Sequence, residues 1–320
     1  MIAAQTPSSA LIDCLPQVRG SYESFASLAQ TTWFRVGGPA EVLYVPADTE
    51  DLSAFLKSKP ADIPVTAIGL ASNLLVRDGG IPGVTIKLGR AFNTIEANGF
   101  VLRCGGSAVD ASVASTARDN AIAGLEFLTG IPGTAGGAVR MNAGAYGREL
   151  QDVFVAATAL DENGAIHKLS REDMGFGYRH CAIPESWVFI GAELKGIRGD
   201  ATTITARIRE IRAEREDAQP VQSRTGGSTF ANSSEAKAWE LIDKAGCRGL
   251  MRGGAQVSEK HCNFLVNSGT ATASDLEGLG EEVRRRVRDL TGIPLTWEIR
   301  RVGVADTNDD APIHRMEAAQ

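Results

Sequence analysis

The sequence predicts an α+β protein of two or three domains. Its 320 residues exceed the roughly 250–300 residues at which single hydrophobic cores stop growing. Patterns typical of strands and of amphipathic helices are mixed along the whole chain. Pro220, which cannot continue a helix, ends a charged helical pattern and predicts a break near residue 218.

The first part of the chain has the spacing of a βαβ unit. A short strand is expected at residues 40–46, and an amphipathic helix that begins at an Asp or Thr cap follows at 48–59. Two further strands are expected at 65–70 and 85–88. Strand, helix and strand in this order are typical of a small α/β domain.

The pattern changes near residue 89. The next segment has a helix rich in Ala and Ser among several strands, and a charged helix at 201–216 with Ile204, Ile208 and Ile211 on one face. The expected strands are 100–104, 153–160, 166–169 and 187–194, and the Ala- and Ser-rich helix is 109–120.

The segment after Pro220 is compact, with a long helix at 273–290. We expect Ser274 or Asp275 to cap this helix and Gly292 to end it. A shorter helix is expected at 236–245, and strands at 255–257, 264–267 and 295–302. The predicted division is an N-terminal extension at 1–20, domains at 21–88, 89–217 and 218–303, and a flexible tail at 304–320.

Composition excludes several classes of protein. A net charge of −6 and a pI of about 5.4 argue against a nucleic-acid binder. The five cysteines lie far apart, which predicts reduced thiols, and the four histidines lack metal-ligand spacing, so we expect no metal. The start of the chain lacks the pattern of a signal peptide, and no apolar stretch is long enough to span a bilayer. We therefore expect a cytoplasmic protein without membrane insertion.

The glycine-rich run at 124–147 is the most informative segment. It reads GLEFLTGIPGTAGGAVRMNAGAYG and holds seven glycines with almost no charge. Glycine costs about 0.5–1 kcal/mol inside regular structure, so this density indicates backbone pressed against a large flat or anionic ligand. The alternative is a set of tight turns that buries a chain crossing. The run is neither a Walker loop nor a GxGxxG that opens a Rossmann unit.

Two shorter segments are weaker candidates for a site. Residues 69–83, GLASNLLVRDGGIPG, follow a predicted strand and could cradle a phosphate with backbone N–H groups, or form only a glycine turn. Residues 224–230, RTGGSTF, could place the Ser228 hydroxyl in a site, or form a turn. No GxSxG elbow surrounds this serine, so hydrolysis is a weak interpretation.

Seven segments together resemble one family, the bacterial UDP-N-acetylenolpyruvoylglucosamine reductases of peptidoglycan precursor synthesis. The resemblance spans residues 20–303, and the middle motif is long and specific. The segments follow the family's order: TWFRVGGPA at 32–40, GLASNLLVRDGG at 69–80, the run at 124–147, Tyr178-Arg179, GGSTF at 226–230, GGAQVSEKHCNF at 253–264 and LTWEIRRVG at 295–303.

The resemblance implies three domains. The first two would bind FAD in the manner of vanillyl-alcohol-oxidase-like (PCMH-type) flavoproteins, and the third would bind the substrate. Only 48 residues separate Arg179 from Ser228, so the chain is similar to the shorter type that lacks an additional tyrosine loop. The implied FAD contacts are Arg35, Gly69, Ser72, Asn73, Leu74, Thr129, Gly130, Pro132, Gly133, Gly136, Gly137, Asn142, Ala143, Gly144 and Tyr146.

The resemblance also implies a reaction in two halves. NADPH would reduce FAD and leave, and reduced flavin would then pass a hydride to the enolpyruvyl group of the UDP-sugar, which gives UDP-N-acetylmuramate. Arg179 would stabilise the charge that develops on the substrate carboxylate. Ser228 would donate a proton, and Glu298 would support the site as a neutral hydrogen-bond donor. From the residues alone, without the family resemblance, Arg179 would be interpreted as a member of a surface ion pair and Glu298 as a carboxylate at the end of a strand.

Substrate contacts carry over less securely, because the two types of the family differ there. The candidates are Tyr178, Arg224, Asn232, Gln256, Lys260 and His261. Two positions depart from the family pattern. Ala71 stands where the family usually has Gly, so either its φ is negative or the loop is remodelled. Asn232 is followed by Ser233 where the family often has Pro.

Two alternatives remain. One is a sugar or hydroxy-acid oxidase on the same scaffold, although no histidine that could tether a flavin lies between residues 1 and 166. The other is a non-catalytic protein that binds nucleotide sugars. The resemblance further implies roles in cell wall biogenesis, cell shape, cell division and the cell cycle, and we expect a monomer.

Overall fold

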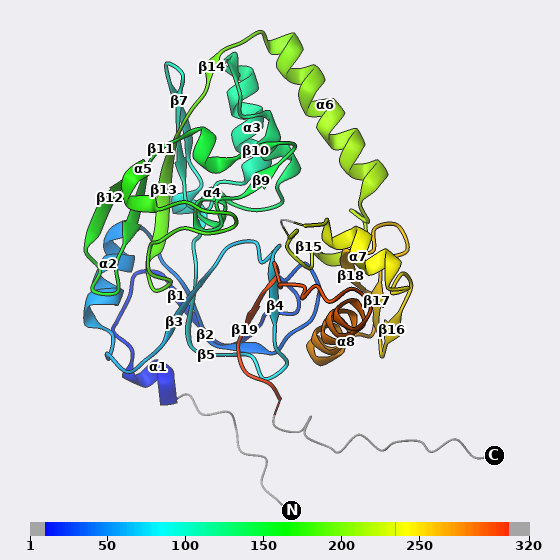
Figure 1. The fold of residues 1–320 in the computed structure, drawn as a ribbon. Coiled ribbons are helices and arrows are strands. Elements are labelled where there is room, and N and C mark those ends of the chain that lie inside the picture. Colours follow the sequence, from blue (N-terminus) through cyan, green and yellow to red (C-terminus); the bar gives the residue numbers. More distant parts are fainter. Residues whose placement is uncertain (1–9, 234, 307–320) are drawn as a thin grey trace, which may run out of the picture.

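The computed structural model of the chain describes residues 10–233 and 235–306, and three larger sheets organise them (Figure 1). Parts of the predicted extension and of the predicted tail, residues 1–9 and 307–320, lie outside the described residues. The predicted α+β class is confirmed. None of the described helices is long and apolar enough to cross a membrane.

The first sheet confirms the βαβ unit. Strands β2, β5 and β3 are parallel, and β1 adds an antiparallel edge, in the order β1-β2-β5-β3. Asp48 caps helix α2, accepting from the Asp51 N–H at 2.9 Å. The predicted elements missed β1, because only Ala26 in it is buried and no alternation marks it. The bounds are β1 Ser21–Ser27, β2 Pro39–Val45, α2 Thr49–Ser58, β3 Val65–Ile68 and β5 Ile81–Lys87.

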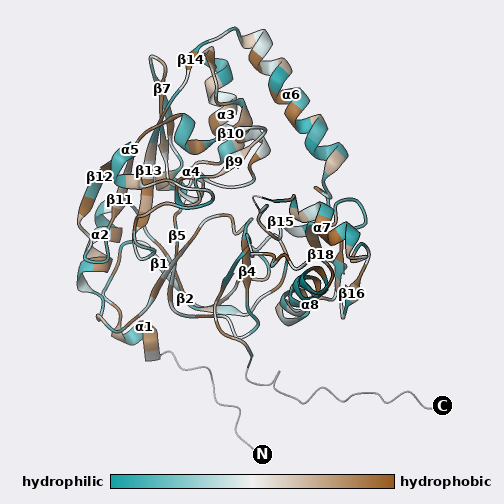
Figure 2. Cartoon of the chain, viewed as in Figure 1, coloured by the Kyte–Doolittle hydropathy of each residue, from teal (hydrophilic) through white to brown (hydrophobic). Residues whose placement is uncertain are grey.

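The second sheet is antiparallel throughout, in the order β12-β11-β13-β7-β6. Helices α3 and α4 pack against it, and α6 covers α3 with the predicted isoleucine face buried. Figure 2 shows mainly hydrophilic residues along α6. The bounds are β6 Ile95–Asn98, β7 Val101–Gly105, α3 Asp110–Asp119, α4 Ala135–Arg140, β11 Phe154–Leu160, β12 Ile166–Ser170, β13 Val188–Lys195 and α6 Ala201–Ala218.

The third sheet has the order β15-β18-β17-β16, with α8 packed against it and α7 packed on α8. The predicted cap of α8 is wrong: Thr272 is the N-cap and accepts from the Asp275 N–H at 3.0 Å, while the Asp275 carboxylate accepts from the Thr272 N–H. Gly292 ends α8 as predicted, with φ +74°. The bounds are β15 Arg224–Ser228, α7 Ala238–Lys244, β16 Met251–Arg252, β17 Ala255–Val257, β18 Phe264–Asn267 and α8 Ala273–Thr291.

A parallel pair of short strands, β4 (Leu74–Val76) and β19 (Arg300–Val302), joins the first part of the chain to its end. The predicted strand at 295–302 is therefore too long. Trp297 makes an isolated bridge to Phe230, and its indole N–H donates to Glu281 on α8 at 2.8 Å, which draws the segment away from a ladder. The remaining short elements are α1 (Ala10–Cys14), η1 (Arg90–Phe92), β8 (Ile122–Ala123), η2 (Glu126–Gly130), β9 (Gly144–Ala145), β10 (Arg148–Glu149), η3 (Leu150–Asp152), α5 (Arg171–Met174) and β14 (Ile197–Arg198).

Candidate active site

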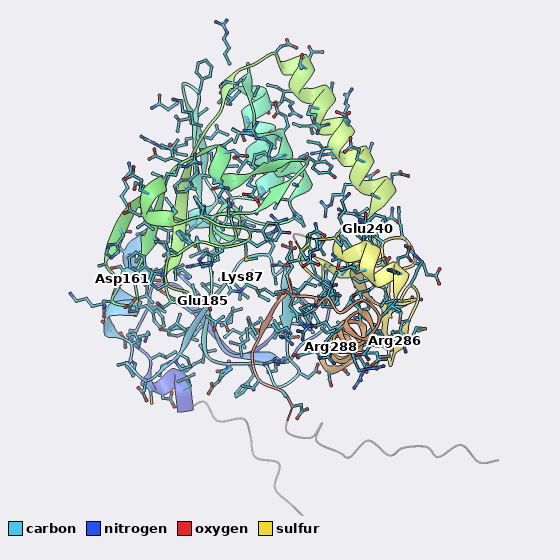
Figure 3. The ribbon with its side chains drawn as sticks, in the orientation of Figure 1. Lys87, Asp161, Glu185, Glu240, Arg286 and Arg288 are labelled. Carbon is cyan, nitrogen blue, oxygen red and sulfur yellow. The ribbon has the colours of Figure 1, made fainter. Side chains whose placement is uncertain are left out.

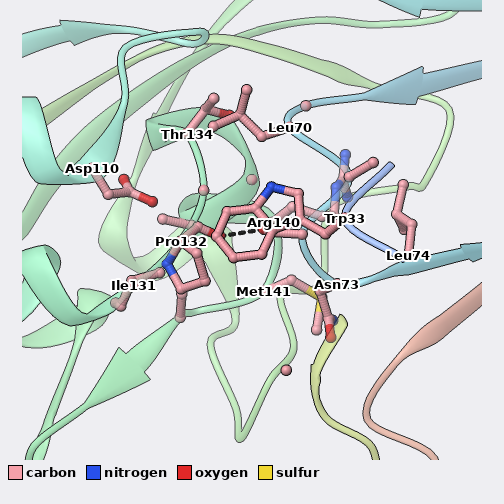
Figure 4. Close-up of a pocket in the computed structure, with 18 of the residues that line it drawn as sticks. Trp33, Leu70, Asn73, Leu74, Asp110, Ile131, Pro132, Thr134, Arg140 and Met141 are labelled. Atoms are coloured by element: carbon pink, nitrogen blue, oxygen red, sulfur yellow. Dashed lines mark hydrogen bonds between the residues drawn. The ribbon is translucent and has the colours of Figure 1, made fainter. Parts of the chain in front are cut away.

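A cavity of about 820 Å³ lies where segments of all three sheets meet. Figure 4 shows its walls, and Figure 3 places Lys87, one of its lining residues, near the middle of the molecule. The walls come from both glycine loops, the turn before Ser228, Arg179 and the segment at 298–300. Side chains distant in the sequence thus line one cavity.

The wall of the cavity is positively charged, although the whole chain is acidic. Six basic side chains line it against three acidic ones; the basic residues are Lys87, Arg90, Arg140, Arg179, Arg215 and Arg300, and the acidic ones are Asp110, Glu214 and Glu298. Burial lowers the pKa of Arg140 and Arg215. Arg140 donates to the carbonyls of Ile183 at 2.6 Å and Trp187 at 2.7 Å. This excess of positive charge at the wall suits an anionic ligand.

At some positions in the run at 124–147 only glycine fits, because other parts of the chain lie too close for a Cβ atom. A Cβ on Gly130 would lie 2.4 Å from the Tyr146 ring, and one on Gly136 would lie 2.9 Å from the Phe189 carbonyl oxygen. Gly137 differs, since a Cβ there would meet only the Thr134 hydroxyl at 3.6 Å. The tight-crossing interpretation therefore applies to part of the run, and all three glycines also line the cavity.

The run also contains helix α4, which the sequence did not predict because Gly136 and Gly137 lower helix propensity. Two backbone hydrogen bonds hold its first turn. The Ala135 N–H donates to the Ala108 carbonyl at 2.8 Å, and the Gly136 N–H donates to the Gly106 carbonyl at 3.0 Å. Tertiary contacts thus satisfy N–H groups that a helix start leaves without partners.

The loop at 69–74 contacts both the glycine run and the segment at 298–300. The Ser72 hydroxyl donates to the Pro132 carbonyl. The Asn73 amide donates to the Glu298 carbonyl at 3.1 Å, and the Arg300 N–H donates to the Asn73 carbonyl at 3.0 Å. Ala71 has φ +52°, so the alternative that its φ is negative is wrong.

Arg179 and Glu298 form an ion pair in the cavity wall, with 2.8 Å between Nε and Oε1. Arg179 also donates to the Gly144 carbonyl at 3.0 Å, and the Tyr178 hydroxyl donates to Glu298 Oε2 at 3.3 Å. Both Glu298 oxygens therefore have hydrogen-bond partners within the site. The side chains are 24% and 12% exposed, so the pair lies at the border of the cavity.

Ser228 lines the same cavity at the end of β15. Two glycines shape its approach: Gly227 has φ +84°, and a Cβ on Gly226 would lie 2.4 Å from the Phe34 ring. Directly after the serine, the Thr229 N–H donates to the Asn263 carbonyl at 2.7 Å. The backbone that carries Ser228 is therefore held on both sides, by the close packing of Gly226 on Phe34 and by the hydrogen bond of the Thr229 N–H, and neither contact uses the serine hydroxyl.

Three predicted cofactor residues are absent from the cavity wall. Asn142 is fully buried, and its amide group bonds Glu149, Gly177 and Gln151 within the protein. Thr129 accepts from Arg212 at 3.2 Å, and Arg35 donates to the Gln30 carbonyl. The other predicted cofactor residues, Gly69, Ser72, Asn73, Leu74, Gly130, Pro132, Gly133, Gly136, Gly137, Ala143, Gly144 and Tyr146, line the cavity.

The six predicted substrate residues lie outside the cavity wall. Tyr178 touches the site through Glu298, whereas Lys260 donates to the Glu216 carbonyl and Asn232 accepts from the Ala238 N–H at 2.9 Å. Burial lowers the pKa of His261, whose Nδ1 accepts from the Asn263 N–H at 3.3 Å. Arg224 and Gln256 lie on β15 and β17.

Other residues line the cavity that no sequence motif indicated, among them Trp33, Lys87, Asp110, Arg140, Arg215 and Arg300. Arg300 stands two positions after Glu298, so strand periodicity offered a signal for it. Asp110 and Arg140 stand on helices, and no local pattern separates them from ordinary surface charges.

Comparison with known proteins gives two family matches. Residues 219–302 match a sequence model of the UDP-N-acetylenolpyruvoylglucosamine reductase C-terminal domain, and residues 40–170 match a model of an FAD binding domain. The two matches lie on either side of the Pro220 break, and each contains part of the cavity wall.

Similar proteins support this assignment over nearly the whole chain. The UDP-N-acetylenolpyruvoylglucosamine reductase of Rhodospirillum rubrum is 58% identical, over 95% of this chain and 97% of its own length. That of Parvibaculum lavamentivorans is 56% identical, over 95% and 98%. The crystal structure of the Thermus caldophilus reductase has a TM-score of 0.77 at 32% identity and covers 90% of this chain and 100% of its own. The chain therefore belongs to the UDP-N-acetylenolpyruvoylglucosamine reductase family, and it is an FAD-dependent oxidoreductase.

Proposed function

We propose that this enzyme uses NADPH to reduce the enolpyruvyl group of UDP-N-acetylglucosamine enolpyruvate to UDP-N-acetylmuramate. One observation carries the proposal: the Arg179–Glu298 ion pair and Ser228 line the same cavity as the glycine run. These three residues come from different parts of the chain, and each has a role in the predicted chemistry. A sugar oxidase or a non-catalytic binding protein has no need of this combination.

The walls of the cavity fit FAD. Glycines at 133 and 137 keep side chains out of the space, and basic side chains outnumber acidic ones. Two buried polar atoms at the wall, Asp110 Oδ2 and Thr225 Oγ1, have no hydrogen-bond partner among the described residues, as expected of atoms that meet a ligand. We propose that the twelve predicted cofactor residues that line the cavity hold FAD, which when bound supplies the hydride.

Arg179 would hold the substrate carboxylate with its planar donor fork. The charge that builds on that carboxylate during reduction would be stabilised by the guanidinium in place before the reaction. Glu298 and Gly144 fix the guanidinium at 2.8 Å and 3.0 Å, so its orientation does not depend on the substrate. Ser228 would donate the proton that completes the product.

Ser228→Ala separates the two half-reactions. NADPH should bleach the flavin at a rate close to that of the unchanged enzyme, because this step does not use the proton donor. Recolouring by the enolpyruvyl sugar should slow at least a hundredfold, within the range general acid catalysis contributes. Stopped-flow absorbance measures both steps.

The exposed Ser223 provides a matched control, since Ser223→Ala should leave both steps unchanged. Equal slowing of both half-reactions in Ser228→Ala would remove Ser228 from its proposed role. Recolouring by simple sugars or hydroxy acids, but not by the enolpyruvyl sugar, would favour an oxidase.

We also propose the setting in which the enzyme works. A soluble nucleotide sugar as substrate fits a cytoplasmic monomer that acts in cell wall biogenesis and thereby in cell shape and division. We propose domains at 21–88, 89–217 and 218–303, because each range contains one of the three larger sheets. Light scattering of the purified protein measures the oligomeric state, and a dimer would contradict the proposal.

A further inference from the structure

Asp110 is a buried acid that no proposed step uses. It is the first residue of α3, is 1% exposed and lines the cavity. Its Oδ2 atom has no hydrogen-bond partner among the described residues. Figure 4 shows the carboxyl group directed from α3 toward the middle of the cavity.

The carboxyl group lies against both loops of the proposed FAD cradle. The Asp110 N–H donates to the Gly133 carbonyl at 3.1 Å, so the two segments are fixed to each other. A Cβ placed on Gly133 would lie 3.0 Å from Asp110 Oδ2 and 3.8 Å from the Ser72 hydroxyl oxygen. Asp110 therefore borders the loop at 69–73 and the start of α4 together, where backbone N–H groups can cradle a phosphate.

Burying the Asp110 carboxyl group without a hydrogen-bond partner lowers the stability of the folded protein, so folding by itself does not account for it. A buried polar group without a hydrogen bond loses its hydration and gains nothing in return. Burial raises the pKa of Asp110 well above its ordinary value, which favours the neutral acid. A neutral carboxyl group can donate through its O–H, whereas an ionised one would repel a nearby phosphate.

We propose that Asp110 is a further cofactor-binding residue, whose carboxyl group donates a hydrogen bond to a diphosphate oxygen of FAD. The proposal rests on the FAD cradle proposed above. It accounts for an acid in a wall otherwise rich in positive charge, and for an oxygen that has no hydrogen-bond partner among residues 10–233 and 235–306.

Two substitutions test the contact through FAD affinity. Asp110→Asn keeps the size and a neutral N–H donor, so the dissociation constant of FAD should stay within about threefold of that of the unchanged holoenzyme. Asp110→Ala removes the donor and should weaken FAD binding about tenfold or more. The rise of flavin fluorescence as the holoenzyme is diluted measures the constant.

Melting of the FAD-free protein separates binding from folding. No described residue bonds the carboxyl group at Oδ2, so Asp110→Ala should leave this melting temperature nearly unchanged. Asp119→Asn, at the exposed far end of α3, is the matched control and should alter neither quantity. Unchanged FAD affinity in Asp110→Ala, or a fall in FAD-free melting that accounts for the lost affinity, would overturn the proposal.

The pH dependence of affinity identifies the atom on the cofactor. The titratable side chain that interacts with Asp110 is Cys104 on β7, and burial raises its pKa to about 12. The adjoining loops present Ser72, Asn73 and Thr134, which carry no charge. FAD affinity should therefore fall as pH rises through the raised pKa of Asp110, and Asp110→Asn should abolish this fall. If FAD affinity instead rises as pH passes through the pKa of Asp110, the ionised carboxylate accepts a hydrogen bond from a ribityl hydroxyl of FAD. That result would overturn the assignment to the diphosphate.

Gly137→Val tests the cradle separately. A Cβ at this position meets only the Thr134 hydroxyl, at 3.6 Å, so the added side chain extends into the cavity with little disturbance of the fold. If Gly137→Val loses FAD while Asp110→Ala binds FAD as tightly as the unchanged protein, the role of Asp110 is contradicted and the proposed FAD cradle is supported. Unchanged FAD binding in Gly137→Val would sink the cradle itself.

Discussion

Three residues other than glycine that line the cavity have left-handed backbone conformations. Ala71, Tyr146 and Arg179 have φ values of +52°, +54° and +53°. Such conformations cost L-residues about 1–2 kcal/mol, and they persist where the surrounding structure holds them. At Arg179 the holding groups are identifiable, because Glu298 and the Gly144 carbonyl fix its side chain. Backbone strain and the proposed chemistry therefore meet at one residue.

Ala71→Gly should stabilise the protein. Glycine adopts positive φ without strain, and this gain exceeds its extra unfolded-state entropy, for a net effect of about 0.5–1 kcal/mol. We expect a higher melting temperature of the holoenzyme. Ala206→Gly, at an exposed interior position of α6, is the opposite control and should cost about 1 kcal/mol. Destabilisation by Ala71→Gly would mean that the Ala71 methyl group packs more favourably than its backbone is strained.

At the scale of elements, sequence patterns found the helices and strands that bury one regular face. Helix α8 is the clearest case, since Leu276, Leu279, Val283 and Val287 are buried at helical spacing. The patterns missed β1 and α4, whose burial is set by neighbours, and they placed the cap of α8 at Ser274 or Asp275 in place of Thr272. Asp275 does take part, as the reciprocal partner in the capping box.

Thr272→Ala should destabilise the third sheet and its helices. It removes the acceptor for the Asp275 N–H, and loss of an N-cap hydroxyl costs about 1 kcal/mol. Thr272→Ser keeps the hydroxyl and should stay close to the unchanged protein. Denaturant unfolding followed by circular dichroism measures both variants. Equal loss in the two variants would show that the threonine methyl group, and not the cap, carries the stability.

At the scale of the whole molecule, residues 74–77 are joined to α8 and to the segment at 300–302. Strands β4 and β19 pair in parallel, and Glu277 on α8 binds Arg77 and Arg301, each at 2.9 Å. Hydrogen bonding to Arg77 is the main cause that lowers the pKa of Glu277. The cavity wall depends on this junction, because Asn73 and Arg300 on either side of it contact the same space.

Glu277→Gln should lower the melting temperature at neutral pH and make the melting temperature less dependent on pH in the acidic range. A lowered pKa in the folded state stabilises the protein above the ordinary value of 4.5, and this contribution is lost as pH falls through the folded-state pKa. The melting temperatures of the variant and the unchanged protein should therefore converge at low pH. Glu240→Gln, exposed on α7, should keep the original pH profile. A constant difference at all pH values would rule out the ion pair as the cause.

The sequence by itself determined the secondary structure that local periodicity encodes, the break near Pro220 and, through ordered motifs, the family and its cofactor. Only the tertiary structure decided which side chains share a space. Arg179 and Glu298 are 119 positions apart, and Asn73 and Glu298 are 225 apart. No local pattern reports such contacts, because they follow from how whole sheets and loops pack. The same reason explains Asn142, a motif residue whose amide is used inside the protein, and Asp110, an ordinary helix acid that packing buries at the cavity wall.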